Sequence, residues 1–280
     1  MKERILLGSV IVYTVLSRFW FIGKFPILIT SSSLPFRFLT AFLSVLGVVF
    51  LYWYTKAVFG DKKIAVLSAF FLGSLPWSFE QGRIASPPSN TMVILLFLLF
   101  AASQKRQLFF KIILYGCIPL ILFFFYPQFW LFRTNLNSFS NIHVLQNLFI
   151  LLSPDLLFFH NITFWWGGVR EAGVLYFSLI PFFLIGIYQL IFSKQRRIFI
   201  WMILILIFSA ASPFFPESRE FFLILPFMCI ILAKGICTFM SQKTIWVKWS
   251  GMFLFFIMIY EMMQFFHYYT VHYQQQVKGN

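Results

Sequence analysis

Single arginines separated by long apolar runs are the residues of this sequence with the most distinctive chemistry. Four of them lie in expected outer loops or at the mouths of expected spans: Arg37, Arg83, Arg170 and Arg219. A guanidinium group is planar and holds its donors in a fixed fork, so it pairs bidentately with phosphate oxygens. The four residues are therefore candidates to bind a phosphate. The alternative is that they cap helix ends and meet lipid headgroups.

The cysteines and histidines do not have the spacing of metal ligands. Each cysteine lies inside an apolar run, as a small buried residue would. Two histidines are five residues apart near the C-terminus and the other two stand alone; the residues concerned are Cys117, Cys229, Cys237, His143, His160, His267 and His272. The sequence therefore predicts no metal site made of Cys and His.

The composition is that of a membrane protein. Of the 280 residues, 60% are hydrophobic and 11% are charged, and the mean hydropathy is +0.85. A soluble domain of this size needs more charged residues to cover its surface. The 42 Phe, 9 Trp and 11 Tyr residues suit lipid-facing helices and interfacial aromatic belts. The net charge of +14 is spread over short clusters, without the contiguous basic face of a nucleic-acid-binding protein.

The elements that must position the arginines are transmembrane helices. A span needs ~20 apolar residues, and the sequence has about nine such runs. We predict an all-α fold, a polytopic transmembrane helical bundle that forms a single membrane domain over residues 1–280. The expected spans are 5–22, 36–54, 64–81, 84–104, 112–132, 173–193, 198–215, 221–240 and 249–266. Prolines interrupt the third and fourth, which are expected to form a tight hairpin with Glu80 and Arg83 at its tip.

The basic clusters predict the orientation of the bundle. Lysine-rich clusters recur after every second expected span, and such clusters mark cytoplasmic loops. The N-terminus is therefore predicted to be cytoplasmic and the C-terminus outside, in a multi-pass protein of the cytoplasmic membrane. The long connection 134–171 then faces outward, and its stretch HVLQNLFILLSPDLLFF suits an amphipathic helix lying in the membrane interface.

Three stretches, taken in order, resemble one family of membrane enzymes. Pro35–Ser89 contains an Arg-led helix, the turn FGDKK and a helix that ends in Pro-Trp and an Arg. LLSPDLLFFHN precedes GVLYFSLIPFFLIGIYQLI, and SPFFPESREFFLILPFMCIILAKG follows. This ordered set is similar to the GT-C superfamily of glycosyltransferases, in particular the protein-mannosyltransferase-like, family 39 type. The resemblance covers most of the chain. It implies transfer of a sugar from a polyprenyl-phosphate donor to an acceptor at the outer membrane face.

Such an enzyme needs a carboxylate to deprotonate the acceptor or hold a divalent metal, and cations to bind the lipid phosphate. The resemblance assigns the phosphate to the four arginines. Members usually carry an Asp in the first outer loop, but the matching interval KFPILITSSSLPFR contains no acid. Glu80, three residues before Arg83, is therefore the candidate catalytic base. Secondary candidates are Asp155, which more readily caps a helix, Glu171, and Glu220, which can pair with Arg219.

Three hypotheses follow from the sequence. The first is an active, minimal transferase that acts on a polyprenyl-phosphate-linked sugar. The second is a catalytically inactive relative that keeps the lipid-binding scaffold and acts as a lipid-binding or accessory membrane subunit. The third is an unrelated small transporter, which would need a polar path near the middle of the membrane. A divalent metal is the one cofactor that this chemistry admits. Membrane lipid is the expected environment, and no protein partner can be identified.

Overall fold

The computed structural model describes residues 2–20, 34–83, 87–103, 141–160, 172–193, 195, 197–210 and 219–272. Every regular element among these residues is a helix, which agrees with the all-α prediction. Three helical segments are long and apolar enough to cross a membrane: Leu34–Phe59, Phe222–Met240 and Ile245–His272. Shorter apolar helices accompany them. The expected span 112–132 lies outside the described residues.

The helices follow one another along the chain with few extended residues between them. The N-terminal part contains α1 (Lys2–Phe19), α2 (Leu34–Phe59), α3 (Lys62–Ser74), α4 (Pro76–Gln81) and α5 (Pro87–Ser103). The C-terminal part contains α8 (Asn141–Leu151), η2 (Asp155–Phe159), η4 (Phe177–Leu179), α9 (Ile180–Ile191), α10 (Arg197–Ala210), η5 (Arg219–Ile224), α11 (Leu225–Met240), α12 (Ile245–His267) and η6 (Tyr268–His272).

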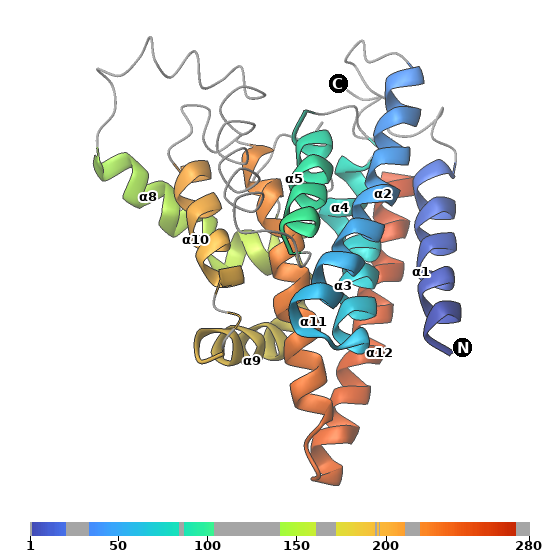
Figure 1. Cartoon of the computed structure of the whole chain (residues 1–280), viewed down its shortest axis with the longest axis vertical. Coiled ribbons are helices and arrows are strands. Elements are labelled where there is room, and N and C mark those ends of the chain that lie inside the picture. The colour runs from blue at the N-terminus through green and yellow to red at the C-terminus, as the bar shows by residue number, and fades with distance from the viewer. Residues whose placement is uncertain are drawn as a thin grey trace.

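Helix α11 lies at the centre of the described bundle (Figure 1). All of its residues from Leu225 to Ala233 are buried, because α3 packs on one side of it and α9 on another. Helix α2 in turn packs against α3 and α5. Helix α1 packs against α2 and α3. The core is therefore a set of apolar helices around α11, with α1 and α12 at the periphery.

A two-residue turn joins α2 to α3. Gly60 has φ 68°, a left-handed conformation that glycine adopts at little cost, and its N–H donates to Lys56 O at 2.9 Å. Asp61 then caps α3, since its side chain accepts from the N–H of Lys63 at 2.8 Å. The sequence FGDKK thus ends one helix and begins the next, which fixes α2 and α3 as antiparallel neighbours.

The region expected as a span over 64–81 is two helices. Helix α3 ends at Ser74, Leu75 is extended, and α4 begins at Pro76. Proline restricts the preceding residue to extended conformations and suits the first turn of a helix, so Pro76 both breaks and restarts the chain. Every residue of α4 is buried. The break positions Glu80 and Arg83 inside the bundle rather than at an exposed tip.

Helix α9 crosses α11 at close range through two glycines (Figure 1). A Cβ built on Gly186 would lie 2.0 Å from Ile231 O, and one built on Gly235 would lie 1.8 Å from Phe182 O. The two backbones can therefore touch only because both residues lack a side chain. Such small-residue contacts are typical of helix packing in membranes.

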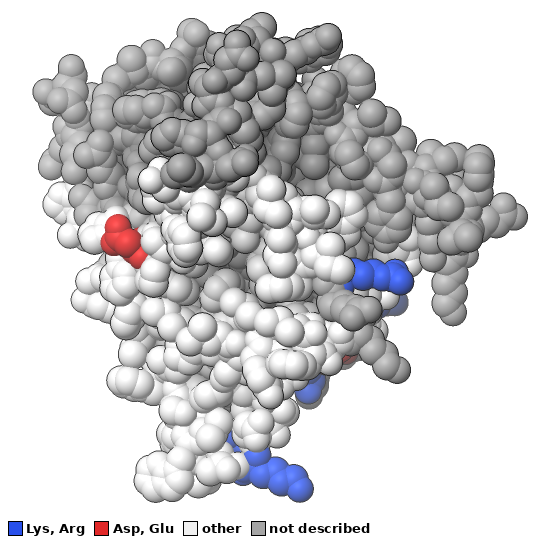
Figure 2. Space-filling model, turned by 90° about the vertical axis from the view of Figure 1, so that its left-hand side faces the viewer, with Lys and Arg blue, Asp and Glu red and all other residues white. Residues whose placement is uncertain are grey.

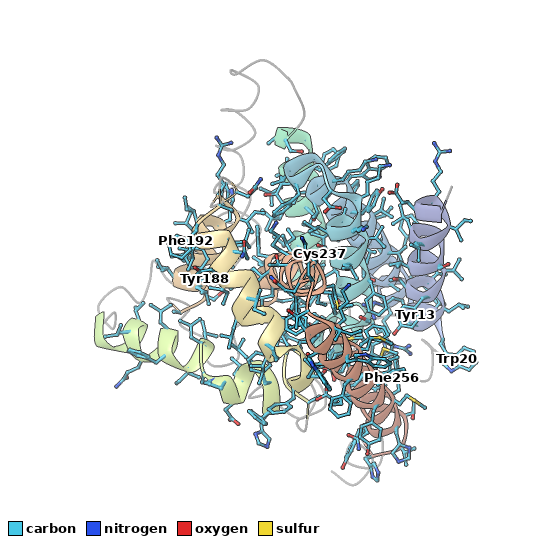
Figure 3. All side chains as sticks on the ribbon, turned by 90° about the horizontal axis from the view of Figure 1, so that it is seen from below. Tyr13, Trp20, Tyr188, Phe192, Cys237 and Phe256 are labelled. Carbon is cyan, nitrogen blue, oxygen red and sulfur yellow. The ribbon has the colours of Figure 1, made fainter. Side chains whose placement is uncertain are left out.

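The outer surface of the bundle is apolar. Helix α12 exposes Trp246, Trp249, Phe253, Phe256 and Tyr260, and only 17% of its most apolar window is buried. On the face drawn in Figure 2 the described surface is almost uncharged, with the Lys and Arg side chains in the lower half of the view. Figure 3 shows Tyr13 and Phe256 on one side of the molecule and the aromatic end of α9 on the other. A surface of this kind is compatible with lipid rather than water.

Charged residues of different type lie at the two ends of the bundle. We call the lower end in Figure 1, where α1 and α3 begin and α2 ends, the lysine end; it carries Lys56, Lys62, Lys63, Lys243 and Lys248. There Lys62 Nζ lies 2.7 Å from a carboxylate oxygen of Glu3. We call the opposite end the arginine end, because it carries Arg18, Arg37 and Arg83. This separation is the pattern on which the predicted orientation rests.

Candidate lipid-phosphate site

Arg83 follows α4 and closes the end of α1. Its Nη1 donates to Ser17 O at 2.8 Å and its Nη2 to Trp20 O at 2.7 Å, which are carbonyls of the last turn of α1. A cation at this position satisfies carbonyls that have no partner within the helix. Arg83 is only 2% exposed. The helix-capping interpretation of this arginine therefore holds, and it fixes the guanidinium firmly in place.

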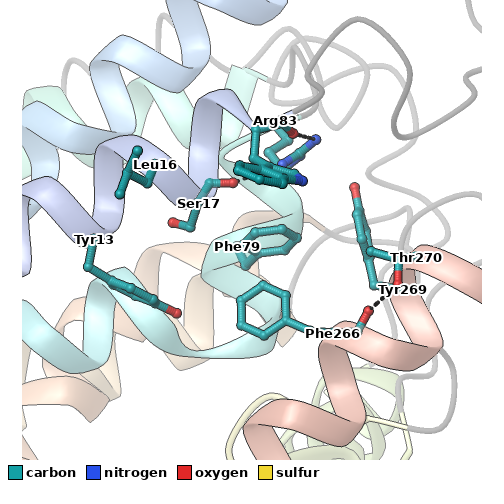
Figure 4. Close-up of a pocket in the computed structure, with 9 residues that line it drawn as sticks. Tyr13, Leu16, Ser17, Phe79, Arg83, Phe266, Tyr269 and Thr270 are labelled. Atoms are coloured by element: carbon teal, nitrogen blue, oxygen red, sulfur yellow. Dashed lines mark hydrogen bonds between the residues drawn. The ribbon is translucent and has the colours of Figure 1, made fainter.

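Arg83 also lines a cavity of about 290 Å³ between α1, α4 and the end of α12 (Figure 4). Figure 4 shows Phe79 at its centre, between Tyr13 and Tyr269, with Arg83 above it. Most of the lining is aromatic or apolar, and Arg83 is the charged residue in it. The lining residues are Tyr13, Leu16, Ser17, Trp20, Phe79, Arg83, Phe266, Tyr269 and Thr270. A single fixed cation in such a wall can hold an anion that is part of a largely apolar molecule.

Tyr269 connects Arg37 and Arg83. It lies in η6, directly after α12, and its ring centroid is 5.7 Å from the guanidinium carbon of Arg83. Arg37, in the first turn of α2, is 8% exposed and close enough to interact electrostatically with both Tyr269 and Arg83. Of the four predicted phosphate-binding arginines, the structure brings these two together.

The other two predicted arginines cannot be placed in the site. Arg170 lies outside the described residues, and so does Glu171. Arg219 and Glu220 begin the short helix η5, but their side chains lie outside the described part of the chain. Their assignment to a lipid phosphate or to a base stays a prediction.

A third arginine, Arg18, belongs to the same region, although the sequence did not single it out. It is 0% exposed, and its guanidinium carbon lies 5.3 Å from the centroid of Phe79, with that of Arg83 at 5.1 Å from the same ring. Arg18 also interacts electrostatically with Arg83 and Tyr269. The one signal in the sequence is a lone cation at the end of an apolar run.

Glu80 lies in the last turn of α4 and is 2% exposed. Its carboxylate is close enough to Tyr269 and Tyr176 to interact electrostatically with both, and Tyr269 also interacts with the arginines. Glu80 is not among the residues that line the cavity. The structure therefore gives Glu80 a position near the cationic site but behind its wall.

Asp155 is part of a local structure away from the arginine cluster. It lies in the first turn of η2 and not at the N-cap, which is Pro154. The hydroxyl of Ser153 accepts from Leu156 N at 3.2 Å, so serine takes the capping role expected of Asp155. The Asp155 carboxylate instead lies 2.7 Å from Nδ1 of His160 on the surface. The contact with His160 accounts for the position of the Asp155 carboxylate, so no role in ligand binding is needed to explain it.

A second cavity, of about 570 Å³, has α1 and α12 on either side and extends towards the lysine end. Its lining is apolar and includes Leu6, Phe70, Phe182, Gly251 and Phe256. The hydroxyl of Tyr13 donates to the sulfur of Met262 at 3.7 Å between the two helices. The two cavities line different parts of the C-terminal helix, Gly251 to Met258 and Phe266 to Thr270, and share no lining residue.

No three His, Cys, Asp or Glu side chains in the described ranges gather closely enough to hold a metal ion.

Comparison of the chain with protein-family models, with curated proteins and with solved structures gives no match.

Proposed function

We propose that this chain is a multi-pass membrane protein that binds a polyprenyl-phosphate lipid, with the phosphate at the arginine end. The observation that carries the proposal is Arg83, which is fixed by two carbonyls of α1 and is the charged residue in the wall of a largely apolar and aromatic cavity. A buried guanidinium in such surroundings attracts a phosphate more strongly than one in water. This corresponds to the second hypothesis from the sequence, a lipid-binding relative of the GT-C type.

The apolar cavity between α1 and α12 supports a long hydrocarbon chain as the other part of the ligand. It has no charged residue in its lining, as a site for hydrocarbon requires. It lines α12 from Gly251 to Met258, on the same helix as the Arg83 cavity, which lines it from Phe266 onward. The two cavities share no lining residue, so the chain of the ligand would reach the apolar cavity only by passing between α1 and α12.

The same proposal includes the predicted topology. About nine spans, a cytoplasmic N-terminus, an outer C-terminus and an outward segment 134–171 place the arginine end at the outer face of the cytoplasmic membrane. The clustered lysines at the opposite end support this orientation. Cysteine accessibility on intact cells tests it, because a reporter cysteine replacing Lys243 must react from the inside only.

Binding is measured with the purified protein in detergent, using undecaprenyl phosphate as the probe. Arg83→Gln is expected to weaken binding about tenfold, the effect of losing one charge-assisted hydrogen bond. Arg4→Gln is the matched control, since Arg4 is an exposed arginine at the opposite end of α1. Equal weakening by both variants, or by neither, would refute a specific phosphate site at Arg83.

The chain-binding half of the proposal has its own test. Leu6 lines the apolar cavity but is 56% exposed, so Leu6→Trp fills the cavity with little disturbance of the core. We expect this change to weaken binding of undecaprenyl phosphate several-fold and leave short-chain farnesyl phosphate within twofold. The same loss for both lipids would contradict a separate site for the chain.

Sugar transfer is the second candidate function, and the position of Glu80 near the arginines favours it. A base has to come within hydrogen-bond reach of the hydroxyl that it deprotonates. Turnover of a labelled polyprenyl-phosphate sugar that disappears in Glu80→Gln, with binding retained, would support this function. Unchanged turnover in the variant would exclude Glu80 as the base.

A further inference from the structure

Tyr13 and Met262 meet between α1 and α12, at the boundary of the two cavities. The hydroxyl of Tyr13 lies 3.7 Å from the sulfur of Met262, within donating distance. On α1, Val10 lines the apolar cavity, and Tyr13, about one turn further on, lines the Arg83 cavity. On α12, Met258 lines the apolar cavity and Phe266 the Arg83 cavity, and Met262 lies about one turn from each. The pair therefore stands where one cavity ends and the other begins.

The contact lies on the faces of α1 and α12 that the cavities share. Residues four apart on a helix lie on one face, so Met262 is in line with Met258 and Phe266. Figure 4 shows the ring of Tyr13 extending from α1 towards the Phe79 and Phe266 rings. A hydrocarbon chain that occupies both cavities has to pass this contact. We call Tyr13 and Met262 together the partition.

The helices that carry the partition are each fixed next to it. On α1, the neighbouring Thr14 is fully buried against α3, where a Cβ built on Gly73 would lie 2.6 Å from Thr14 Oγ1. On α12, the neighbouring Glu261 accepts from Ser178 N at 3.2 Å and from Ser178 Oγ at 2.5 Å. The two backbones cannot separate at this level without breaking these contacts. A passage between the cavities therefore opens by movement of the side chains.

The two side chains of the partition are able to move. Both are partly exposed rather than locked in the core. Methionine is unbranched and has three rotatable bonds, so it adapts to irregular spaces. Its sulfur is a weak acceptor, so the hydrogen bond from Tyr13 is a weak one. Displacing the partition therefore has a modest cost in free energy, and only a ligand that passes it meets this cost.

We propose that Tyr13 and Met262 set the chain-length preference of the lipid site. An isoprenoid chain that ends within the Arg83 cavity leaves the partition closed, whereas a longer chain displaces it and enters the apolar cavity. The inference rests on the proposed function and deepens it, because it names the residues that select among lipid phosphates. The affinity for a long chain is then the gain from burying it in the apolar cavity less the cost of opening the partition.

The competing explanation is that Tyr13 and Met262 only hold α1 against α12. Loss of a purely structural contact lowers stability and weakens the binding of every lipid alike. Loss of a partition instead favours the long chain and leaves the short chain unaffected. The ratio of long-chain to short-chain affinity therefore separates the two roles.

The test measures binding of undecaprenyl phosphate and farnesyl phosphate to the purified full-length chain in detergent. Met262→Ala removes the side chain that blocks the passage and should raise the ratio of undecaprenyl to farnesyl affinity about fivefold, the effect of one weak hydrogen bond and its packing. Tyr13→Phe removes only the hydroxyl and keeps the ring, so the ratio should rise about twofold with the packing intact. Met263→Ala is the matched control, because Met263 is the next residue of α12 and is 65% exposed.

The possible failures of the inference and of the proposed function differ. A ratio that is the same in Met262→Ala, Met263→Ala and wild type overturns the partition, and so does an equal loss of affinity for both lipids in Met262→Ala. The proposed function stands in either case if Arg83→Gln still weakens the binding of both lipids. Wild type that binds neither lipid overturns the proposed function itself.

A second measurement follows affinity along a series of isoprenyl phosphates, from geranyl to undecaprenyl. Each isoprene unit that is buried against apolar walls should raise the affinity. In wild type, we expect one chain length at which the affinity stops rising, where the chain reaches the partition, before it rises again. Met262→Ala should lack this step. A steady rise in both proteins, or the same step in both, contradicts the role of Tyr13 and Met262.

Discussion

Replacing Gly235 by alanine should disrupt the close backbone contact between α9 and α11. An added Cβ at this position would lie 1.8 Å from Phe182 O and 3.0 Å from Gly186 N. Carbon and oxygen atoms in contact need about 3.5 Å, so α9 must move away from α11 by about 1.5 Å. The clash is with backbone atoms, which cannot rotate aside as a side chain can.

The size of the effect follows from that geometry. Overpacking a core with one methyl group costs about 1–3 kcal/mol when side chains can adjust. Because backbone blocks the adjustment here, we expect Gly235→Ala to lose at least about 2 kcal/mol of unfolding free energy. Gly186→Ala meets Ile231 O at 2.0 Å and should cost a similar amount. One separation of the helices relieves both clashes, so the double variant should cost less than the sum of the two.

Gly8→Ala is the matched control. A Cβ on Gly8, within α1, has no atom within 4 Å, so the same chemical change meets no obstacle. Alanine is also the better helix former, which predicts a gain of about 0.5–1 kcal/mol. Unfolding is followed by circular dichroism in detergent, by heat and by increasing denaturing detergent. If Gly235→Ala unfolds at the same temperature as Gly8→Ala, the proposed backbone contact between α9 and α11 is wrong.

Three further predictions concern single contacts. Glu261→Ala removes the carboxylate that accepts from Ser178 N at 3.2 Å and from Ser178 Oγ at 2.5 Å. This change should lower the unfolding free energy by about 1–3 kcal/mol in the same assay. No loss of stability would mean that these hydrogen bonds do not hold α12 in place. Tyr176→Phe removes the bond from the tyrosine hydroxyl to Ser74 O at 2.9 Å and should cost about 1 kcal/mol, with a stability equal to wild type as the contradicting result. Asp61→Ala removes the cap of α3 and should lower stability by about 1 kcal/mol, whereas Asp61→Asn should be nearly neutral; equal losses in the two variants would contradict capping.

The sequence was most informative where local chemistry decides the structure. The abundance of apolar residues indicated a membrane protein, whose helices satisfy their own backbone hydrogen bonds in lipid. Every regular element described is helical. The turn FGDKK, noted in the sequence as part of the resemblance, lies between two helices, where Gly60 follows α2 and Asp61 caps α3. Pro76 was recognisable as an interruption, although the sequence does not show that α3 and α4 form separate helices.

Patterns of neighbouring residues did not predict which segments far apart in the sequence come into contact. The sequence placed Arg37 and Arg83 at the same predicted face, and the structure has them close enough to interact electrostatically. The burial of Arg18 was not expected, because at the end of α1 it looks like an interfacial anchor. Its burial depends on Phe79 and on the space left by Gly82, neither of which has any signal in the sequence around Arg18.

The geometry of Glu80 bears on the choice between carrying a lipid and transferring its sugar. A base has to reach the acceptor hydroxyl, yet Glu80 is 2% exposed and separate from the residues that line the Arg83 cavity. Glu80 interacts electrostatically with Tyr269, which also interacts with the arginines. The proposed lipid binding does not require Glu80 to reach the ligand, whereas sugar transfer needs a route from Glu80 to the cavity, and α4 would have to move to open one.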